Sequence, residues 1–199
     1  YLARPESETV GILACGVQGR TNLEALCCLF KIKKVFAYDV LPEIQDLFVR
    51  DMSRQLGLQV IGVKDPQRAV VDSDMVVTSG PILKHPTPTI DRDWLKPGAF
   101  ASAVDFDSYW TPGALAQFDK IATDDHAQFN YYRTVGYFQA TPEPYADLGE
   151  LAIGLKPGRE RRYRRTSEGR NGRTCPQRPI GPSATWRPHW WTRRSHTAR

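Results

Sequence analysis

The chain has 199 residues, enough for one domain and part of a second. Its net charge of +5 is unevenly spread, because residues 1–158 carry 15 basic and 20 acidic side chains, whereas residues 159–199 carry 12 arginines and two glutamates. The basic balance therefore belongs to the C-terminal segment, so we expect no nucleic-acid partner, and the lack of a long apolar run predicts no membrane span.

The N-terminal residues and the cysteines indicate where in the cell the protein is expected. The first residues lack a charged segment followed by an apolar one, which predicts no signal peptide. Cys15, Cys27, Cys28 and Cys175 show no C-x-x-C spacing, so we expect reduced thiols and a cytoplasmic protein. The histidines show no metal-ligand spacing, and no metal site is predicted.

The first predicted elements form a strand, a glycine turn and a helix. The strand covers residues 11–14, the helix residues 21–30, and a second strand over residues 35–38 ends in Asp39. This order is typical of a dinucleotide-binding βαβ unit, in which glycines and the helix N-terminus bind the pyrophosphate and the acid binds the adenosine ribose. Ala14 stands where the pattern has its first glycine. A βα turn without a nucleotide is the alternative.

Asp39 predicts NAD rather than NADP as the cofactor. A carboxylate accepts hydrogen bonds from the ribose hydroxyls and repels a 2′-phosphate, and no Arg or Lys follows Asp39 directly. Cys15, inside the turn, has two interpretations. It is either a reactive thiol whose pKa the helix N-terminus lowers, or a small residue that fills a tight turn.

Strands and helices continue to alternate down the chain. We predict helices over residues 43–56, 66–71 and 126–133, the second capped by Asp65 and the third by the pair Asp124 and Asp125. A metal site is the alternative for this carboxylate pair. Further strands are predicted over residues 58–63, 75–78, 100–104 and 120–123. Apolar strands separated by helices predict an α/β fold, a doubly wound Rossmann-type parallel sheet.

Glycine and polar residues gather at the predicted C-terminal ends of these strands. Ligands of parallel sheets bind at that edge, so we expect a site there. The residues concerned are Gly16, Asp39, Thr78, Ser79 and Asp107.

Four segments share a further pattern. They read GILACGVQGR at residues 11–20, DMVVTSGP at 74–81, LKPGAFASAVDFD at 95–107 and DLGELAIGLKPGR at 147–159. Gln18 is the distinctive residue of the glycine turn. In this order and spacing, the segments resemble the ornithine cyclodeaminase/mu-crystallin family of NAD(P)-dependent enzymes.

The resemblance implies a set of cofactor contacts along the strand ends. They are Gly16, Val17 and Gln18 at the pyrophosphate, Asp39 at the adenosine ribose, Thr78 and Ser79 at the nicotinamide-side ribose, and Ala101, Ser102, Ala103 and Val104 beneath the nicotinamide.

The resemblance also implies a catalytic role for Asp107, which matches the family's acid that activates or orients the reacting amine. In cyclodeamination, a hydride leaves the amino-acid Cα for NAD⁺, the side-chain amine attacks the imine, ammonia leaves and the hydride returns. The alternative is that Asp107 merely caps the turn over residues 108–112. A second interpretation of the whole protein is a binder of NAD or another small ligand without turnover.

Two departures from the family affect these expectations. The half that supplies the substrate pocket, the carboxylate-binding cations and the dimer interface in the homo-oligomeric relatives would precede Tyr1, so we expect little turnover by this chain alone. Residues 1–160 form the predicted dinucleotide-binding domain. Residues 161–199, rich in Arg, Pro and Trp, are expected to be disordered, and we interpret them as an out-of-frame ending, with a basic tail for RNA or acidic lipid as the alternative.

Overall fold

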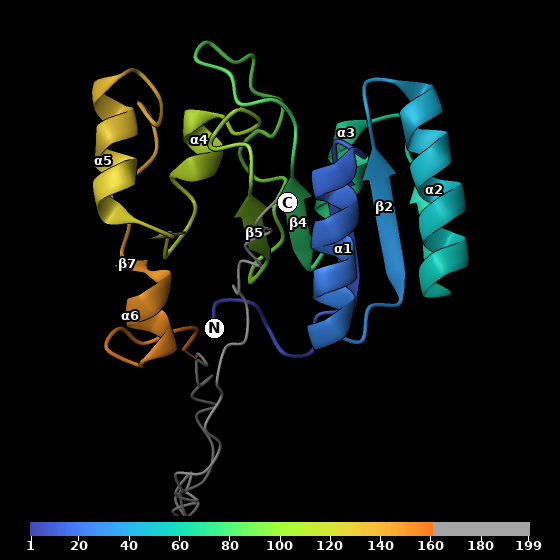
Figure 1. Cartoon of the computed structure of the whole chain (residues 1–199), viewed down its shortest axis with the longest axis horizontal. Helices are drawn as coiled ribbons and strands as arrows, with labels where there is room; N and C mark the ends of the chain where they lie inside the picture. Colours follow the sequence, from blue (N-terminus) through green and yellow to red (C-terminus); the bar gives the residue numbers. More distant parts are fainter. Residues whose placement is uncertain (161–199) are drawn as a thin grey trace, which may run out of the picture. The chain divides into compact units, whose positions relative to one another are not determined.

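The structure, a computed structural model, describes residues 1–160 (Figure 1). The expectation for residues 161–199 lies outside the described residues. In chain order, the elements are β1 (Thr9–Leu13), α1 (Val17–Leu29), β2 (Lys34–Tyr38), α2 (Pro42–Leu56), β3 (Gln59–Gly62), α3 (Pro66–Val71), β4 (Met75–Thr78), β5 (Phe100–Ala103), α4 (Pro112–Leu115), β6 (Ala122–Thr123), α5 (His126–Thr134), β7 (Ala146–Asp147) and α6 (Leu148–Ala152).

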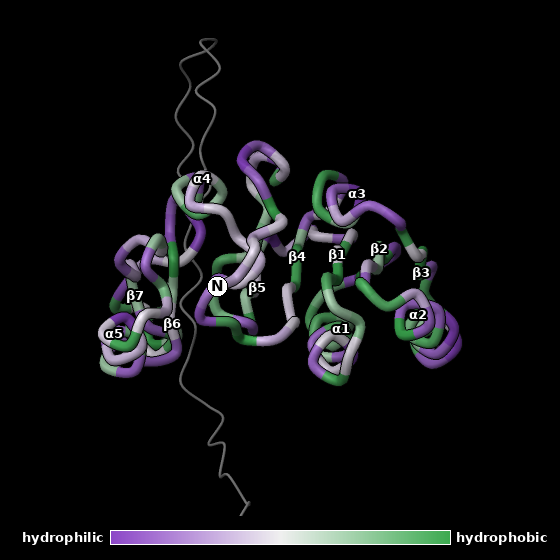
Figure 2. The backbone as a smooth tube through the Cα atoms, turned by 90° about the horizontal axis from the view of Figure 1, so that it is seen from above, coloured by the Kyte–Doolittle hydropathy of each residue, from purple (hydrophilic) through white to green (hydrophobic). Residues whose placement is uncertain are grey.

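Five parallel strands form the central sheet in the order β3-β2-β1-β4-β5. Helices α1 and α2 cover one face of this sheet, and α3 and α4 lie on the other (Figure 2). The prediction of a doubly wound parallel sheet is therefore confirmed. None of the helices in the described part of the chain is long and apolar enough to cross a membrane.

The apolar strands supply cores on both faces of the sheet. Val10 and Ile12 of β1 belong to the cluster beneath α1 and α2, which includes Phe48, whereas Leu13 belongs to the opposite cluster with Val70 of α3. All five side chains are fully buried. Because successive residues of a strand point to opposite faces, a strand buried on both sides needs a continuous apolar run.

One predicted helix start and one predicted sheet assignment are wrong. Helix α1 begins at Val17 rather than at residue 21, because Gly16 is its N-cap and no side-chain cap marks the start. Residues 120–123 were predicted as a strand of the main sheet. Instead, the two-residue strand β6 pairs with β7 in a separate parallel sheet, and Lys120 is bound through its ammonium to the carbonyl oxygens of Pro157 and Gly158.

The predicted helix caps are confirmed. The side chain of Asp65 accepts a hydrogen bond from the Gln67 N–H at the start of α3, and that of Asp125 accepts one from the Gln128 N–H at the start of α5. Helix α6 begins with a capping box, a reciprocal pair of hydrogen bonds between Asp147 and Glu150.

Asp74 ties the N-terminal segment to the start of β4. Its carboxylate accepts hydrogen bonds from the Glu8 N–H at 2.9 Å and the Thr9 N–H at 3.0 Å, and it pairs with Lys96 at 2.8 Å and with Arg4. Burial by itself would raise the pKa of Asp74, but the hydrogen bonds from Lys96, Glu8 and Thr9 lower it well below its usual value.

We expect Asp74→Asn to lower the free energy of unfolding by about 2 kcal/mol at pH 7, because the neutral amide loses both charge-assisted contacts. The lowered pKa means that this stabilisation is present above the ordinary pKa of 3.8 and is lost as the pH falls. Urea titrations at pH 7 and near pH 3 therefore should show a difference that shrinks in acid. An equal difference at both pH values would contradict the assignment.

Candidate functional site

The strand order reverses direction between β1 and β4. From β1 the chain proceeds to β2 and β3 on one side, and from β4 to β5 on the other. In open α/β sheets, the loops that follow the two strands at such a point separate and leave a crevice at the carboxyl edge. The glycine turn after β1 and residues 79–81 after β4 are these two loops.

Residues at the end of β2 hold the glycine turn in place through hydrogen bonds. The Ala14 N–H donates to the Tyr38 carbonyl at 2.9 Å, and the Cys15 N–H donates to the Asp39 carboxylate at 2.7 Å. Ala14 has a φ of 75°, the left-handed conformation that favours glycine. The departure from the glycine pattern is thus a change of residue only, because the backbone keeps the conformation that a glycine would adopt.

The start of α1 is open to a ligand. Its N-cap, Gly16, provides no side chain, and its first turn contains no acidic residue. Val17 is 77% exposed and Gln18 is also exposed, so neither side chain is used in packing. The first N–H groups of a helix lack partners within the helix, and together with the helix dipole they favour an anion.

The glycines of the turn differ in what surrounds them. A Cβ added at Gly16 would meet no atom within 4 Å, whereas one at Gly19 would lie 2.5 Å from the Ala14 carbonyl oxygen. Gly16 therefore leaves free space at the helix start, and Gly19 lets α1 pack closely on the turn. The residues present fit a dinucleotide pyrophosphate at this place.

Asp39 lies at the end of β2, half-buried. One carboxylate oxygen accepts from the Cys15 N–H, and the other accepts from the Leu41 N–H at 3.0 Å. The Asp39 N–H in turn donates to the Gln45 side-chain oxygen at 3.0 Å. The carboxylate is thus fixed beside the glycine turn, as the spacing in the sequence predicts for a ribose-binding acid.

Cys15 is a packing residue. Its side chain is fully buried, and burial followed by the negative charge of Asp39 raises the pKa of the thiol to about 12. The alternative of a reactive thiolate is therefore wrong, because the desolvation outweighs any effect of the helix N-terminus.

Ser79 and Thr78 follow each other at the end of β4 but differ in their surroundings. The Ser79 hydroxyl donates to the Ala14 carbonyl at 2.9 Å, which joins the loop after β4 to the glycine turn. Thr78 is fully buried, and its hydroxyl donates to Asp105 at 2.6 Å and accepts from the Trp110 indole N–H at 3.2 Å. The Thr78 hydroxyl is thus part of a buried network.

Asp105 and Trp110 were missed by the sequence analysis. Asp105 is only 1% exposed, and its second oxygen accepts from the Gly80 N–H at 3.0 Å. Burial raises the pKa of Asp105, although the hydrogen bonds from Thr78 and Gly80 lower it in part. The available signal was the pair of acids in the segment VDFD directly after β5, of which only Asp107 was selected.

Thr78→Val is expected to lower the free energy of unfolding by about 2–3 kcal/mol at nearly constant volume, because it removes the partner of the buried Asp105 Oδ1 and of the Trp110 N–H, while Asp105 Oδ2 keeps its bond from Gly80. Thr21→Val is the matched control. The Thr21 hydroxyl is exposed and bonds only to carbonyls of its own helix. Urea unfolding should show a change below about 0.5 kcal/mol for the control. Similar values for both variants would contradict a stabilising network.

The strand predicted over residues 100–104 forms as β5 and pairs with β4 in parallel. The Val104 N–H donates to the Thr78 carbonyl at 2.9 Å, and Ala101 and Val104 pack against the two core clusters. Ser102 is half-buried and Ala103 is exposed. Of the four residues assigned to the nicotinamide side, Ala101, Ser102 and Ala103 lie on β5 beside β4, and Val104 follows directly after the strand.

Asp107 lies on a cavity of about 150 Å³ after β5. One of its carboxylate oxygens accepts from the Thr141 hydroxyl at 3.0 Å. Most of the cavity wall is apolar or aromatic, and it includes Lys84, Trp110, Tyr137 and Phe138. A half-buried carboxylate in such a cavity can handle a proton or hold an amine.

Tyr109 is a further residue at this edge that the sequence analysis missed. Its ring covers Gly80, where an added Cβ would lie 2.6 Å from Cε2. Burial, followed by the charges of Asp105 and Asp39, raises the pKa of its phenol to about 12. The tyrosine thus stays a neutral phenol across the physiological range.

Comparison with known proteins identifies the family of this chain. A profile of the Ornithine cyclodeaminase/mu-crystallin family matches residues 1–166. The chain belongs to this family. The resemblance seen in the four sequence segments is therefore confirmed.

Relatives within the family include enzymes and NAD complexes. The alanine dehydrogenase of Archaeoglobus fulgidus is 30% identical over 172 residues, which cover 80% of this chain and 50% of the relative. The Δ1-pyrroline-2-carboxylate reductase of Thermococcus litoralis, solved with NADH and L-proline, has a TM-score of 0.65 and 25% identity, covering 81% of this chain and 52% of that one. An archaeal alanine dehydrogenase dimer with bound NAD has a TM-score of 0.62 and 27% identity, covering 81% and 51%.

The chain spans about half the length of these relatives. Members of the family include dehydrogenases, reductases and a cyclodeaminase, and the two related structures described above contain NADH and NAD.

Proposed function

We propose that this chain is the NAD-binding part of an oxidoreductase that acts on an α-amino acid or its imine. The observation that carries the proposal is the free, side-chain-less start of α1 at Gly16, next to the fixed carboxylate of Asp39. Few ligands need both an anion site and a carboxylate that accepts hydroxyl hydrogen bonds, and a dinucleotide needs both.

The proposed cofactor is NAD in preference to NADP. Gly16, Val17 and Gln18 would hold the pyrophosphate through backbone N–H groups, and Asp39 would accept the adenosine ribose hydroxyls. Ser79 and residues 101–104 would contact the nicotinamide half, whereas the Thr78 hydroxyl is bound to Asp105 and would position this edge without contacting the cofactor itself. When bound, the nicotinamide supplies hydride transfer to or from a carbon atom.

Asp107 is the proposed proton-handling residue. The Thr141 hydroxyl holds one carboxylate oxygen, and the cavity brings a small ligand to the same side chain. An ionised Asp107 would orient the amine of an α-amino acid and take a proton from it, and the apolar wall with Trp110 and Phe138 would exclude water.

The substrate class rests on the relatives. One relative is an alanine dehydrogenase, and another was solved with L-proline. Alanine and proline are both α-amino acids. Ornithine cyclodeamination, with loss of ammonia, is the narrower version of the proposal and rests on the family as a whole. The alternative is a binder of NAD or of a small ligand without turnover.

A second copy of the chain is the proposed partner in the full-length protein, since one relative is a dimer.

An assay with cofactor and substrate separates these versions. Full-length protein is incubated with NAD⁺ and L-alanine, L-proline, L-ornithine or L-lysine, and NADH absorbance and ammonia are followed. We expect NADH to accumulate with one of them, and Asp107→Asn to reduce the rate by at least about 100-fold while the NADH dissociation constant stays within about twofold. Ammonia without net NADH would favour cyclodeamination. NADH binding without any turnover would support the binder, and no NADH binding would overturn the proposal.

A further inference from the structure

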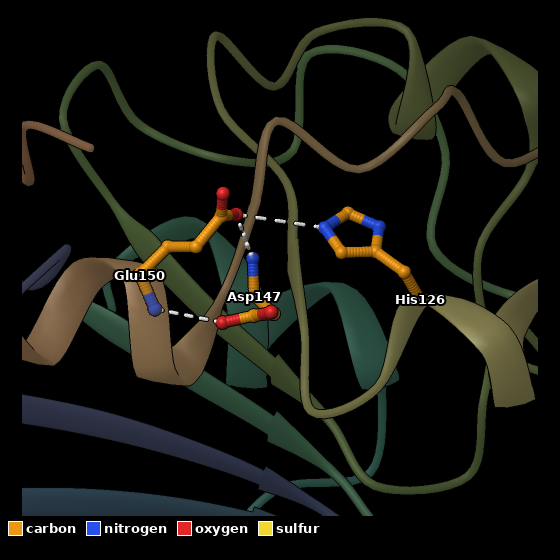
Figure 3. Close-up of side chains that lie close together, drawn as sticks. All are labelled: His126, Asp147 and Glu150. Carbon is orange, nitrogen blue, oxygen red and sulfur yellow. Dashed lines mark hydrogen bonds and ion pairs between the residues drawn. The ribbon is translucent and has the colours of Figure 1, made fainter. Parts of the chain in front are cut away.

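Three side chains with metal-binding atoms meet away from the cofactor edge. His126 is the first residue of α5, Asp147 is the N-cap of α6, and Glu150 lies in the first turn of α6. Each offers one ligand atom, and these atoms all lie within 4.8 Å of one another. Figure 3 shows the imidazole of His126 turned toward the carboxylate of Glu150.

The fold brings the three together through the small sheet. Strands β6 and β7 are parallel, so their carboxyl ends lie side by side, and the chain enters α5 after β6 and α6 after β7. The sequence predicts no metal site, because the histidines show no metal-ligand spacing and the pair Asp124 and Asp125 fits a helix cap. The ligands come from segments that only the β6–β7 pairing places next to each other.

The two carboxylates are held in place and remain available. In the capping box, Asp147 uses Oδ1 to accept from the Glu150 N–H at 2.7 Å, and Glu150 uses Oε2 to accept from the Asp147 N–H at 3.0 Å. Asp147 Oδ2 and Glu150 Oε1 have no hydrogen-bond partner within residues 1–160. Capping therefore explains why these acids are here, but it uses only half of their oxygens.

The distance to the histidine does not fit a hydrogen bond. His126 Nε2 lies 3.6 Å from Glu150 Oε2, the oxygen that also accepts from the Asp147 N–H, and this separation is longer than an N–H···O bond. A carboxylate oxygen has two lone pairs, so Oε2 can serve both the cap and a cation. Zn–N and Zn–O bonds of about 2.1 Å place two ligands of a tetrahedral ion about 3.4 Å apart. The separation is thus close to that of two atoms that share one cation.

We propose that His126, Asp147 and Glu150 bind a divalent transition-metal cation of the zinc type, which clips the start of α5 to the start of α6. One imidazole and two carboxylates are ligands that zinc accepts, and partial exposure of His126 and Glu150 leaves room for water as a fourth ligand. The two negative charges offset the unfavourable effect of two helix N-termini on a cation. The site is independent of the proposed cofactor function.

Zinc titration of the metal-free full chain by calorimetry tests the proposal. Glu150→Gln keeps the capping box, because glutamine can accept from the N-cap N–H, but it removes a charged ligand. His126→Gln removes the imidazole. We expect one Zn²⁺ bound by the parent chain at this site, with the affinity reduced at least about tenfold in each variant.

The control is a variant with Cys27→Ser and Cys28→Ser. It removes two neighbouring thiols of α1 that could bind zinc, and it should bind zinc at the proposed site like the parent. Zinc bound elsewhere in the chain is common to the parent, His126→Gln and Glu150→Gln, so it cancels in the comparison of these three proteins. Thermal unfolding in EDTA should give similar midpoints for all the proteins. No zinc binding by the parent, or unchanged affinity in either His126→Gln or Glu150→Gln, would overturn the proposal.

Discussion

Gly16→Ser should lower the affinity for NAD⁺ by at least about tenfold (~1.4 kcal/mol) without destabilising the protein. The space around Gly16 is empty, with no atom within 4 Å of an added Cβ, so the side chain fits when no ligand is bound. A serine at the N-cap also accepts hydrogen bonds from the first turn of α1, which stabilises the helix by about a few tenths of a kcal/mol. The same hydroxyl occupies the place that we assign to the pyrophosphate.

Gly19→Ala is the control for this experiment. Its Cβ would lie 2.5 Å from the Ala14 carbonyl oxygen, so it should reduce the free energy of unfolding by about 2 kcal/mol or more. Calorimetry measures the affinity for NAD⁺, and urea unfolding measures the free energy of unfolding. If Gly16→Ser binds NAD⁺ like the parent, the start of α1 is not the pyrophosphate site.

The second large effect concerns the choice between NAD⁺ and NADP⁺. We expect the parent protein to bind NAD⁺ at least about 30-fold (~2 kcal/mol) more tightly, because a 2′-phosphate would face the Asp39 carboxylate. Asp39→Asn should narrow the difference to below about tenfold, mainly by raising the affinity for NADP⁺. The amide oxygen of asparagine can still accept from the Cys15 N–H, so the glycine turn should keep its conformation.

Asp125→Asn provides the matched control, since it removes a carboxylate that caps α5 and does not contact the glycine turn. It should leave the NAD⁺ to NADP⁺ ratio unchanged. Titrations of all three proteins with both cofactors give the ratio directly. Equal affinity of the parent for both cofactors, or preference for NADP⁺, would remove Asp39 from the proposed ribose site.

The sequence alone determined the arrangement of the βαβ unit. The apolar runs of β1, β2 and β4, the caps at Asp65 and Asp125, and the position of Asp39 follow from local chemistry. A strand buried on both faces must be continuously apolar, and a cap must lie directly before its helix, so both leave a mark in neighbouring residues. The family was recognisable for the same reason, because its motifs are short and contiguous.

Other features depended on contacts between distant segments. The start of α1 at Gly16 was missed because a glycine cap carries no side-chain signal. The network of Thr78, Asp105 and Trp110 forms only when β5 lies beside β4, and burial rather than sequence position decides the pKa of Cys15.

The small β6–β7 sheet shows the same limit most clearly. Its strands have two residues each, too short for a periodic pattern, yet their pairing brings His126 to Asp147 and Glu150. The spacing of residues in a sequence can reveal metal ligands only when they lie on one helix or one turn. Ligands from separate segments meet only through tertiary pairing, so this cluster was decided by the fold. The glycine turn and Asp39, on which the proposed cofactor site rests, were decided largely by the sequence.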